Sequence, residues 1–154
     1  MISQKQKAEA FRKLHEAPGA FVIPNPWDVG TAKILADLGY KALATTSAGF
    51  AFSVGRPDGD GVIGREATLA NFATIVKATP LPVSADLQGG FGRTPESVAD
   101  TFRLAGEAGL VGGSIEDASG DTQHPILDVG RAKERVAAAV ESVRRLPYPF
   151  MLTA

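Results

Sequence analysis

The sequence has 154 residues, with 44% hydrophobic and 21% charged residues, and this balance is ordinary for a globular protein. A formal net charge of −1 offers no basic surface for nucleic acid or for an acidic membrane, and no apolar stretch approaches the roughly 20 residues that span a bilayer. The absence of cysteine excludes disulfides and thiolate chemistry, so we expect a cytoplasmic protein without a nucleic-acid or membrane partner.

The N-terminal segment predicts a helix followed by a strand. Ala8, Phe11 and Leu14 recur three residues apart, which places them on one face of a helix over about residues 3–15. A short apolar run, AFVIPN at 20–25, predicts the first strand. The chain therefore opens with a helix that precedes the first strand.

The next segment alternates helix and strand around one long loop. Residues 28–39 and 65–79 carry apolar residues at helical spacing, and KALATTS at 41–47 predicts the second strand. Residues 48–64 are rich in glycine and turn formers, so we expect a loop there. Long loops in compact domains are usually functional or disordered.

The C-terminal half continues the alternation. LPVSADL at 81–87 and LVGGSIED at 110–117 predict strands. A helix over 94–107 begins with a Thr cap and a proline in its first turn, and the longest helix covers 128–146. PYPFMLTA at 147–154 begins a fifth strand.

Strands that alternate with helices predict an α/β fold with a parallel sheet and right-handed crossovers. The strands are short and apolar, as expected for parallel strands that are buried on both faces. Two architectures fit this order: a doubly wound open sheet and part of a (β/α)8 barrel. Ligands bind at the carboxyl ends of the strands in both.

Acidic and amide side chains gather at those strand ends. The third expected strand ends in Asp86, with Gln88 two residues later, and the fourth ends in Glu116. Because side chains two apart on a strand point the same way, we expect Asp86 and Gln88 to face one site. The long loop adds Asp58 and Asp60. Grouped carboxylates need a cation, and oxygen ligands without cysteine suit Mg2+ or Mn2+.

Simpler structural roles compete for some of these residues. Asp28 precedes a helix and suits a cap, and Asp60 suits a turn. Trp27 suits a packing position or the wall of a pocket. We favour a functional role for Asp86 and Glu116, because both stand at the ends of apolar strands.

Three stretches, in this order along the chain, resemble the isocitrate lyase/phosphoenolpyruvate mutase superfamily: IPNPWDVGTAKILADLGYKALATTSAGFA, PVSADLQGGFG and GGSIEDAS. The likeness runs nearly the whole length and looks closest to the phosphoenolpyruvate mutase-like branch. It implies a (β/α)8 TIM barrel, with about the first five strands in residues 1–154 as a single domain. It also implies Mg2+ at the carboxyl ends of the strands, and chemistry on small 2-oxo or 2-hydroxy acids through a pyruvate-type enolate.

The resemblance also implies individual roles. Asp86 corresponds to the direct metal ligand, and Gln88 and Glu116 correspond to acids that hold the metal through waters. Asp58 corresponds to the acid of a gating loop, so Asp58 and Glu116 are the expected catalytic residues. The backbone amides of 48–50 correspond to those that hold the substrate carboxylate. The full substrate-binding set is expected to be Trp27, Ser47, Ala48, Gly49 and Phe50.

Three departures from the family pattern narrow the function. Position 88 is Gln where the family usually has an acid, which predicts a weaker metal site. The loop DASGDTQHP lacks the Lys-Lys-Cys-Gly-His motif of isocitrate and methylisocitrate lyases, so those activities are not expected. It also lacks the lysine-bearing loop of true phosphoenolpyruvate mutase. The last strand has only begun at LTA, before the Arg that the family uses to bind substrate.

Five strands cannot close an eight-stranded barrel, and the fragment would expose two sheet edges and an apolar inner face. We therefore expect the chain to be part of a longer protein that forms a homo-oligomer. The leading hypothesis is a Mg2+-dependent lyase that acts on the C–C bond of a small 2-oxo or 2-hydroxy acid. A phosphonate P–C bond mutase or hydrolase and a non-catalytic relic stay open as alternatives.

Overall fold

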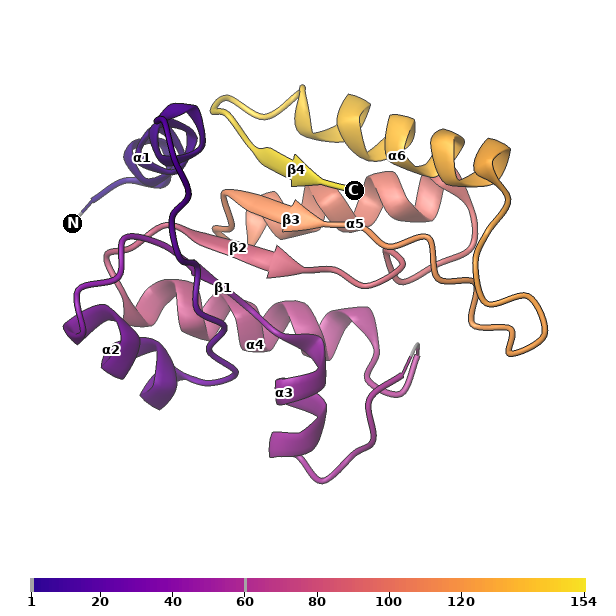
Figure 1. Cartoon of the computed structure of the whole chain (residues 1–154), viewed down its shortest axis with the longest axis horizontal. Helices are drawn as coiled ribbons and strands as arrows, with labels where there is room; N and C mark the ends of the chain where they lie inside the picture. Colours follow the sequence, from indigo (N-terminus) through magenta and orange to yellow (C-terminus); the bar gives the residue numbers. More distant parts are fainter. Residues whose placement is uncertain (1, 60) are drawn as a thin grey trace.

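A parallel sheet forms the centre of the protein, and helices lie on both of its faces (Figure 1). In the computed structural model, which describes residues 2–59 and 61–154, the sheet has four strands in the order β1-β2-β3-β4. The strands are β1 Leu43–Ala44, β2 Val83–Asp86, β3 Gly112–Ser114 and β4 Met151–Thr153. Every neighbouring pair is parallel, as predicted from the alternation of strands and helices.

Six helices accompany these strands in the described part of the chain, and the first two precede β1. They are α1 Gln4–Glu16, α2 Val29–Asp37, α3 Ser47–Ser53, α4 Arg65–Ala78, α5 Pro95–Glu107 and α6 Val129–Val143. Side-chain caps start most of them: for α5, the Thr94 hydroxyl accepts a hydrogen bond from the Ser97 amide. Among the described residues, none of these helices combines the length and apolarity needed to cross a bilayer.

The outer face of the sheet carries the main hydrophobic core. Val83 and Ala85 of β2 are buried in it against Phe72 of α4 and Phe102 of α5. Helix α6 adds Ala139, and α5 and α6 pack along each other behind the sheet (Figure 1). Because alternate side chains of a strand point to opposite faces, the intervening residues of β2 face the other side.

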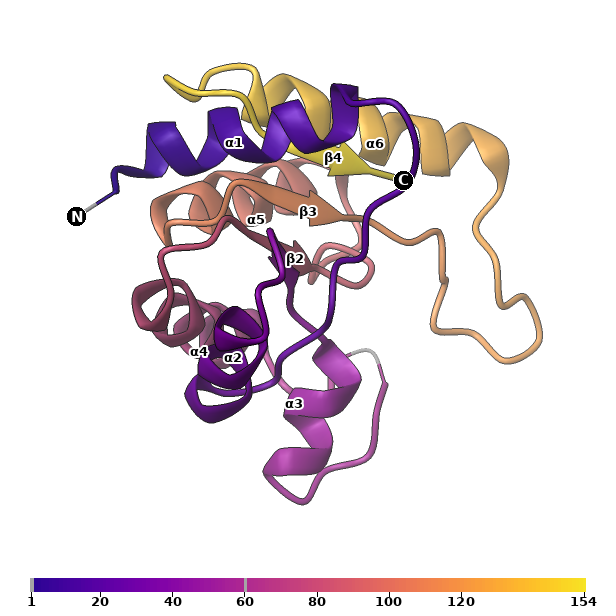
Figure 2. The ribbon, with the colours of Figure 1, turned by 60° about the vertical axis from the view of Figure 1, so that its left-hand side comes forward.

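Polar and small residues line this other, inner face. Ser84 and Asp86 of β2 and Ser114 of β3 border a cavity there. Ala42 and Met151 pack with Phe11 of α1 in a second hydrophobic cluster, so the predicted apolar inner face is apolar only in part. Helix α1 covers part of the inner face (Figure 2), where the Phe11 ring lies 2.8 Å from the position of a Cβ built on Gly112. The inner face therefore carries both the contact with α1 and the cavity.

The predicted first strand over 20–25 does not form. Its only backbone hydrogen bond to the sheet in the described residues runs from the Ala44 amide to the Pro24 carbonyl, at 3.0 Å. Pro24 and Pro26 have no amide hydrogen, so this segment cannot donate a regular ladder to β1. The Asn25 side chain instead donates to the Ala44 carbonyl. The fold therefore has four strands in the described chain where five were expected.

The predicted loop over 48–64 is partly helical. Its first residues belong to α3, and Thr46 caps this helix by accepting from the Gly49 amide at 3.1 Å. Glycine content alone suggested a loop, but a capped first turn compensates for the low helix propensity of one glycine. The remaining predicted helices and strands lie where the periodicity placed them, with boundaries shifted by a few residues.

Candidate functional site

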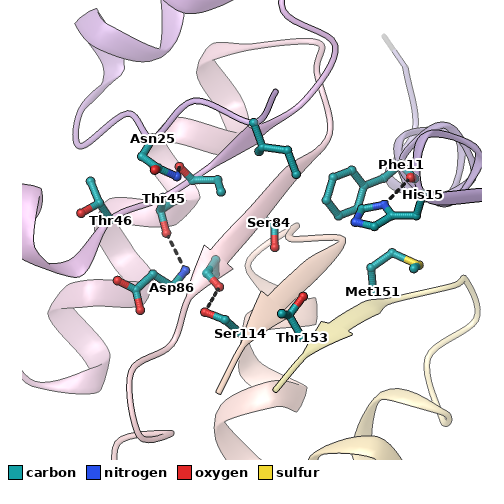
Figure 3. Close-up of a pocket in the computed structure, with 13 residues that line it drawn as sticks. Phe11, His15, Asn25, Thr45, Thr46, Ser84, Asp86, Ser114, Met151 and Thr153 are labelled. Carbon is teal, nitrogen blue, oxygen red and sulfur yellow. Dashed lines mark hydrogen bonds between the residues drawn. The ribbon is translucent and has the colours of Figure 1, made fainter. Parts of the chain in front are cut away.

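The candidate site is a cavity of about 310 Å3 on the inner face, which reaches the carboxyl ends of β1, β2 and β3. Figure 3 shows Asp86, Thr45 and Ser114 gathered at one end of this cavity and His15 and Phe11 at the other. Ligands bind at the carboxyl ends of strands in parallel α/β sheets. The cavity therefore lies where the fold predicts a binding site.

Three donors hold the Asp86 carboxylate. Oδ2 accepts from the Ser47 amide at 2.9 Å and from the Ser47 hydroxyl at 2.6 Å. Oδ1 accepts from the Gln88 amide at 3.1 Å. The Asp86 amide in turn donates to the Thr45 hydroxyl at 3.1 Å. Asp86 therefore connects the end of β2 to the first turn of α3.

The donor chemistry of Asp86 fits one direct bond to Mg2+. A carboxylate has about four acceptor positions. Three of them are occupied by the two Ser47 donors and the Gln88 amide, which leaves one position on Oδ1. Mg2+ in proteins commonly takes one or two carboxylate oxygens and keeps several waters. Asp86 borders the cavity of about 310 Å3, which is large enough to hold such waters.

Gln88 does not continue the alternation of β2. The strand ends at Asp86, and Gln88 lies in a turn with φ of 48°, in the left-handed region. The prediction that strand alternation orients both side chains is therefore wrong, because a turn residue no longer follows that alternation. The Gln88 carbonyl accepts from the Glu116 amide at 2.9 Å, so the turn after β2 contacts the segment after β3. Backbone contacts thus bring Asp86, Gln88 and Glu116 into one region.

The acids of the long loop are less closely tied to this region. Asp58 is exposed and is not among the residues that border the cavity. Asp60 lies outside the described residues. Within residues 2–59 and 61–154, no three acids or histidines lie together as a metal cluster would require. The expected gathering of many carboxylates is therefore absent from the described chain, which leaves Asp86 as the central acid.

The expected substrate-binding residues lie in and beside the first turn of α3. The amide of Phe50 donates to the Thr46 carbonyl, and that of Gly49 donates to the Thr46 hydroxyl. The amide of Ala48 has no acceptor among the described residues, so the predicted carboxylate contact rests mainly on it. Trp27 packs beside this turn, since its Cβ lies 3.1 Å from the position of a Cβ built on Gly49.

Asp28 is a helix cap. Its carboxylate accepts from the amide of Thr31 at 2.7 Å and from the hydroxyl of Thr31 at 2.8 Å. These hydrogen bonds lower the pKa of Asp28 from its ordinary value, with the Thr31 amide as the largest cause. This arrangement accounts for Asp28 without a role in the site.

Sequence reasoning missed the hydroxyl groups of the cavity. Thr45, Ser84, Ser114 and Thr153 all border it. The position of Ser84 could have been predicted from the sequence, because Ser84 stands two residues before Asp86 on the same strand and therefore on the same face. Ser114 is paired with Asp86 in the register of β2 and β3, and register is not visible in the sequence.

Residues 11–154 match the family model of phosphoenolpyruvate phosphomutase. The chain belongs to this family. A solved structure from Burkholderia cenocepacia J2315, provisionally named a lyase/mutase, superposes with a TM-score of 0.93 at 59% identity, covering 97% of this chain and 52% of that one. The uncharacterized protein Rv1998c of Mycobacterium tuberculosis is 34% identical over 131 residues, which are 84% of this chain and 47% of that protein.

The chain is also similar in sequence to a curated lyase. The 2-methylisocitrate lyase of Halalkalibacterium halodurans is 32% identical over 115 residues, which are 75% of this chain and 38% of that enzyme. The chain thus spans about half the length, or less, of the curated relatives it matches. Solved TIM-barrel relatives are likewise covered over about half of their length, so the sheet corresponds to part of a barrel.

Proposed function

We propose that this chain supplies the cation site and part of the substrate pocket of a Mg2+-dependent lyase. The enzyme would cleave or form a C–C bond in a small 2-oxo or 2-hydroxy carboxylic acid through a pyruvate-type enolate. One observation carries the proposal: the Asp86 carboxylate borders the cavity, and three donors hold it there and occupy three of its about four acceptor positions. Membership in a family with lyase relatives supports the same chemistry.

The residues of the candidate site would divide between binding Mg2+ and binding the substrate. Asp86 would hold Mg2+ directly, and Gln88 and Glu116 would hold its waters. Mg2+, when bound, would supply a Lewis acid for the negative charge that develops on an enolate oxygen. The Ala48 amide would bind the substrate carboxylate, with Trp27, Ser47, Gly49 and Phe50 shaping its surroundings.

The exposed position of Asp58 suits a residue of a gating loop. Such a loop would exclude water from the cavity when substrate is bound, which strengthens electrostatic contacts inside it. Asp58 and Glu116 are therefore proposed as catalytic, by their correspondence to the family's acids. Replacing Asp58 by Asn tests this role: turnover should fall while Mg2+ affinity stays unchanged.

A substrate screen tests the proposed reaction. The purified full-length protein would be mixed with MgCl2 and with 2-methylmalate or 2-methylisocitrate, whose C–C cleavage releases pyruvate, and pyruvate would be measured. We expect product from 2-methylmalate and none from 2-methylisocitrate, because the loop at 117–125 lacks the Lys-Lys-Cys-Gly-His motif. The Asp86→Asn variant is the control for contaminating activity. Turnover that Asp86→Asn does not reduce would contradict the proposal.

A phosphonate P–C bond mutase or hydrolase is the second candidate, favoured by the family model itself. Release of inorganic phosphate from phosphonopyruvate, without product from the carboxylic acids, would select it. No product from any of these compounds would favour a non-catalytic relic. The homo-oligomer is also proposed for the full-length protein, and native mass spectrometry would measure it.

A further inference from the structure

Arg135 of α6 is a buried cation that reaches the turn after β2. Its side chain is 6% exposed, and Nη2 donates to the carbonyls of Gly89 and Gly92. The contact with Gly92 measures 3.0 Å. One guanidinium therefore holds both sides of the glycine-rich turn that follows Asp86. A buried charge is costly unless hydrogen-bonded, so these carbonyls are part of what allows Arg135 to be buried there.

Other donors hold the same turn from inside the protein. The hydroxyl of Thr101 on α5 donates to the Gly90 carbonyl at 2.7 Å, and the Glu116 amide donates to the Gln88 carbonyl at 2.9 Å. The carbonyls of residues 88, 89, 90 and 92 are thus directed toward donors of α5, α6 and the segment after β3. This pattern fixes the backbone orientation of the whole turn.

The turn has a backbone conformation that needs such support. Gln88 and Phe91 are both non-glycine residues with positive φ, at 48° and 54°. A non-glycine residue in this region is strained and persists only where the surrounding structure enforces the conformation. Arg135 is the charged member of that surrounding structure.

The conformation of this turn also affects the Asp86 carboxylate. The Gln88 amide donates to Oδ1 of Asp86, the oxygen with the remaining acceptor position. A shift of the Gln88 backbone would therefore turn or release this oxygen. None of the three donors to the Asp86 carboxylate belongs to Arg135, so the route from Arg135 to Asp86 that the structure shows runs through the turn.

We propose that Arg135 is a positioning residue for the cation site: by holding the Gly89 and Gly92 carbonyls, it fixes Gln88 and thereby the orientation of Asp86. The proposal rests on the proposed Mg2+ site. It places one determinant of that site on α6, 46 residues along the chain from Gly89.

Lys7 provides a matched control. It is also a buried cation, 9% exposed, and its Nζ donates to the carbonyls of Thr79 at 2.7 Å and Val76 at 3.3 Å. These carbonyls lie at the end of α4, away from Asp86. Replacing Lys7 by Met thus removes a similar set of hydrogen bonds without touching the turn.

The experiment compares Arg135→Met, Arg135→Lys and Lys7→Met with the wild type. Titration calorimetry measures Mg2+ affinity, and amide hydrogen exchange of the metal-free proteins measures protection of the Gln88 and Gly90 amides. We expect Arg135→Met to bind Mg2+ about 10-fold to 100-fold more weakly and to exchange both amides faster. Arg135→Lys should fall between it and the wild type, because an ammonium lacks the planar fork of Arg. Lys7→Met should lose stability but keep its Mg2+ affinity.

The outcomes separate the two proposals. The positioning role is overturned if a folded Arg135→Met variant binds Mg2+ within about twofold of the wild-type affinity. It is also overturned if the loss of Mg2+ affinity in Arg135→Met is no larger than the loss in Lys7→Met. If Arg135→Met does not fold, the same criteria apply to Arg135→Lys. A wild type whose Mg2+ binding is absent, or is unchanged in Asp86→Asn, overturns the proposed function and with it this inference. Hydrogen exchange in the metal-free protein then still reports whether Arg135 holds the turn.

Discussion

Asp86 has two separable roles, as an acceptor that holds α3 and as a proposed ligand of Mg2+. Replacing Asp86 by Ala removes the acceptor for three hydrogen bonds, two from Ser47 and one from Gln88. A hydrogen bond contributes a net 0.5–1.5 kcal/mol, so the half-buried set is worth about 3 kcal/mol. For a domain of this length, about 1 kcal/mol shifts Tm by about 2–4 °C. We expect Asp86→Ala to lower Tm by about 6–12 °C without metal.

Asp86→Asn separates the two roles. The Asn carbonyl oxygen can still accept both Ser47 donors, so only the hydrogen bond from Gln88 is lost, at about 1 kcal/mol. Mg2+ at about 100 times its Kd stabilises a protein that binds it by about 2.7 kcal/mol. The wild type should therefore gain about 5–10 °C in Tm with Mg2+, and both variants should gain almost nothing.

Thermal unfolding followed by circular dichroism measures both effects, with NaCl of matched ionic strength as the salt control. Ser47→Ala is the intermediate case, because it removes the hydroxyl donor and keeps both the Ser47 amide and the carboxylate of Asp86. A wild-type-like Tm for Asp86→Ala would show that the carboxylate does not hold α3. An equal Mg2+ response in Asp86→Asn and the wild type would show that Asp86 is not the ligand.

Gln88→Glu should tighten Mg2+ binding by about tenfold or more, because it adds a negative charge near the cation; calorimetry with no tightening would mean that Gln88 does not face the metal. Gly112→Ala should destabilise by about 1–3 kcal/mol, because its Cβ would lie 2.8 Å from the ring of Phe11; an unchanged urea midpoint would contradict the position of α1. Burial lowers the pKa of Lys7 below 10.5, so the unfolded state binds more protons between that lowered pKa and 10.5. The unfolding free energy should therefore rise with pH in this window in the wild type relative to Lys7→Met, as urea melts at alkaline pH would show.

Local patterns were enough to place most helices and strands. Apolar spacing and a Thr cap located α5, and the alternation of elements predicted a parallel sheet. The predictions of secondary structure were wrong where proline or a helix cap outweighed the local pattern of apolar residues or glycines. The apolar run before Pro24 looked like a strand, but proline removed the amide donors that a ladder needs. The glycine content of residues 48–64 hid the capped turn of α3.

The candidate site could likewise be predicted from the sequence only in part. Its central acid, Asp86, could be predicted, because a carboxylate at the end of an apolar strand is visible in the sequence. The direction of Gln88 could not, because a positive φ in the turn ended the alternation of the strand. The hydroxyl of Ser114 was also missed, since strand register places it beside Asp86.

The sequence by itself determined the order of the elements, their capping signals and the presence of an acid at the end of β2, because these depend on residues close together in the chain. The tertiary structure decided what surrounds that acid. Ser47 reaches Asp86 across 39 residues, and Arg135 reaches Gly89 across 46. Buried charges and strand-end carboxylates take whichever partners the folded chain brings within hydrogen-bond distance, and no local pattern encodes which ones these are.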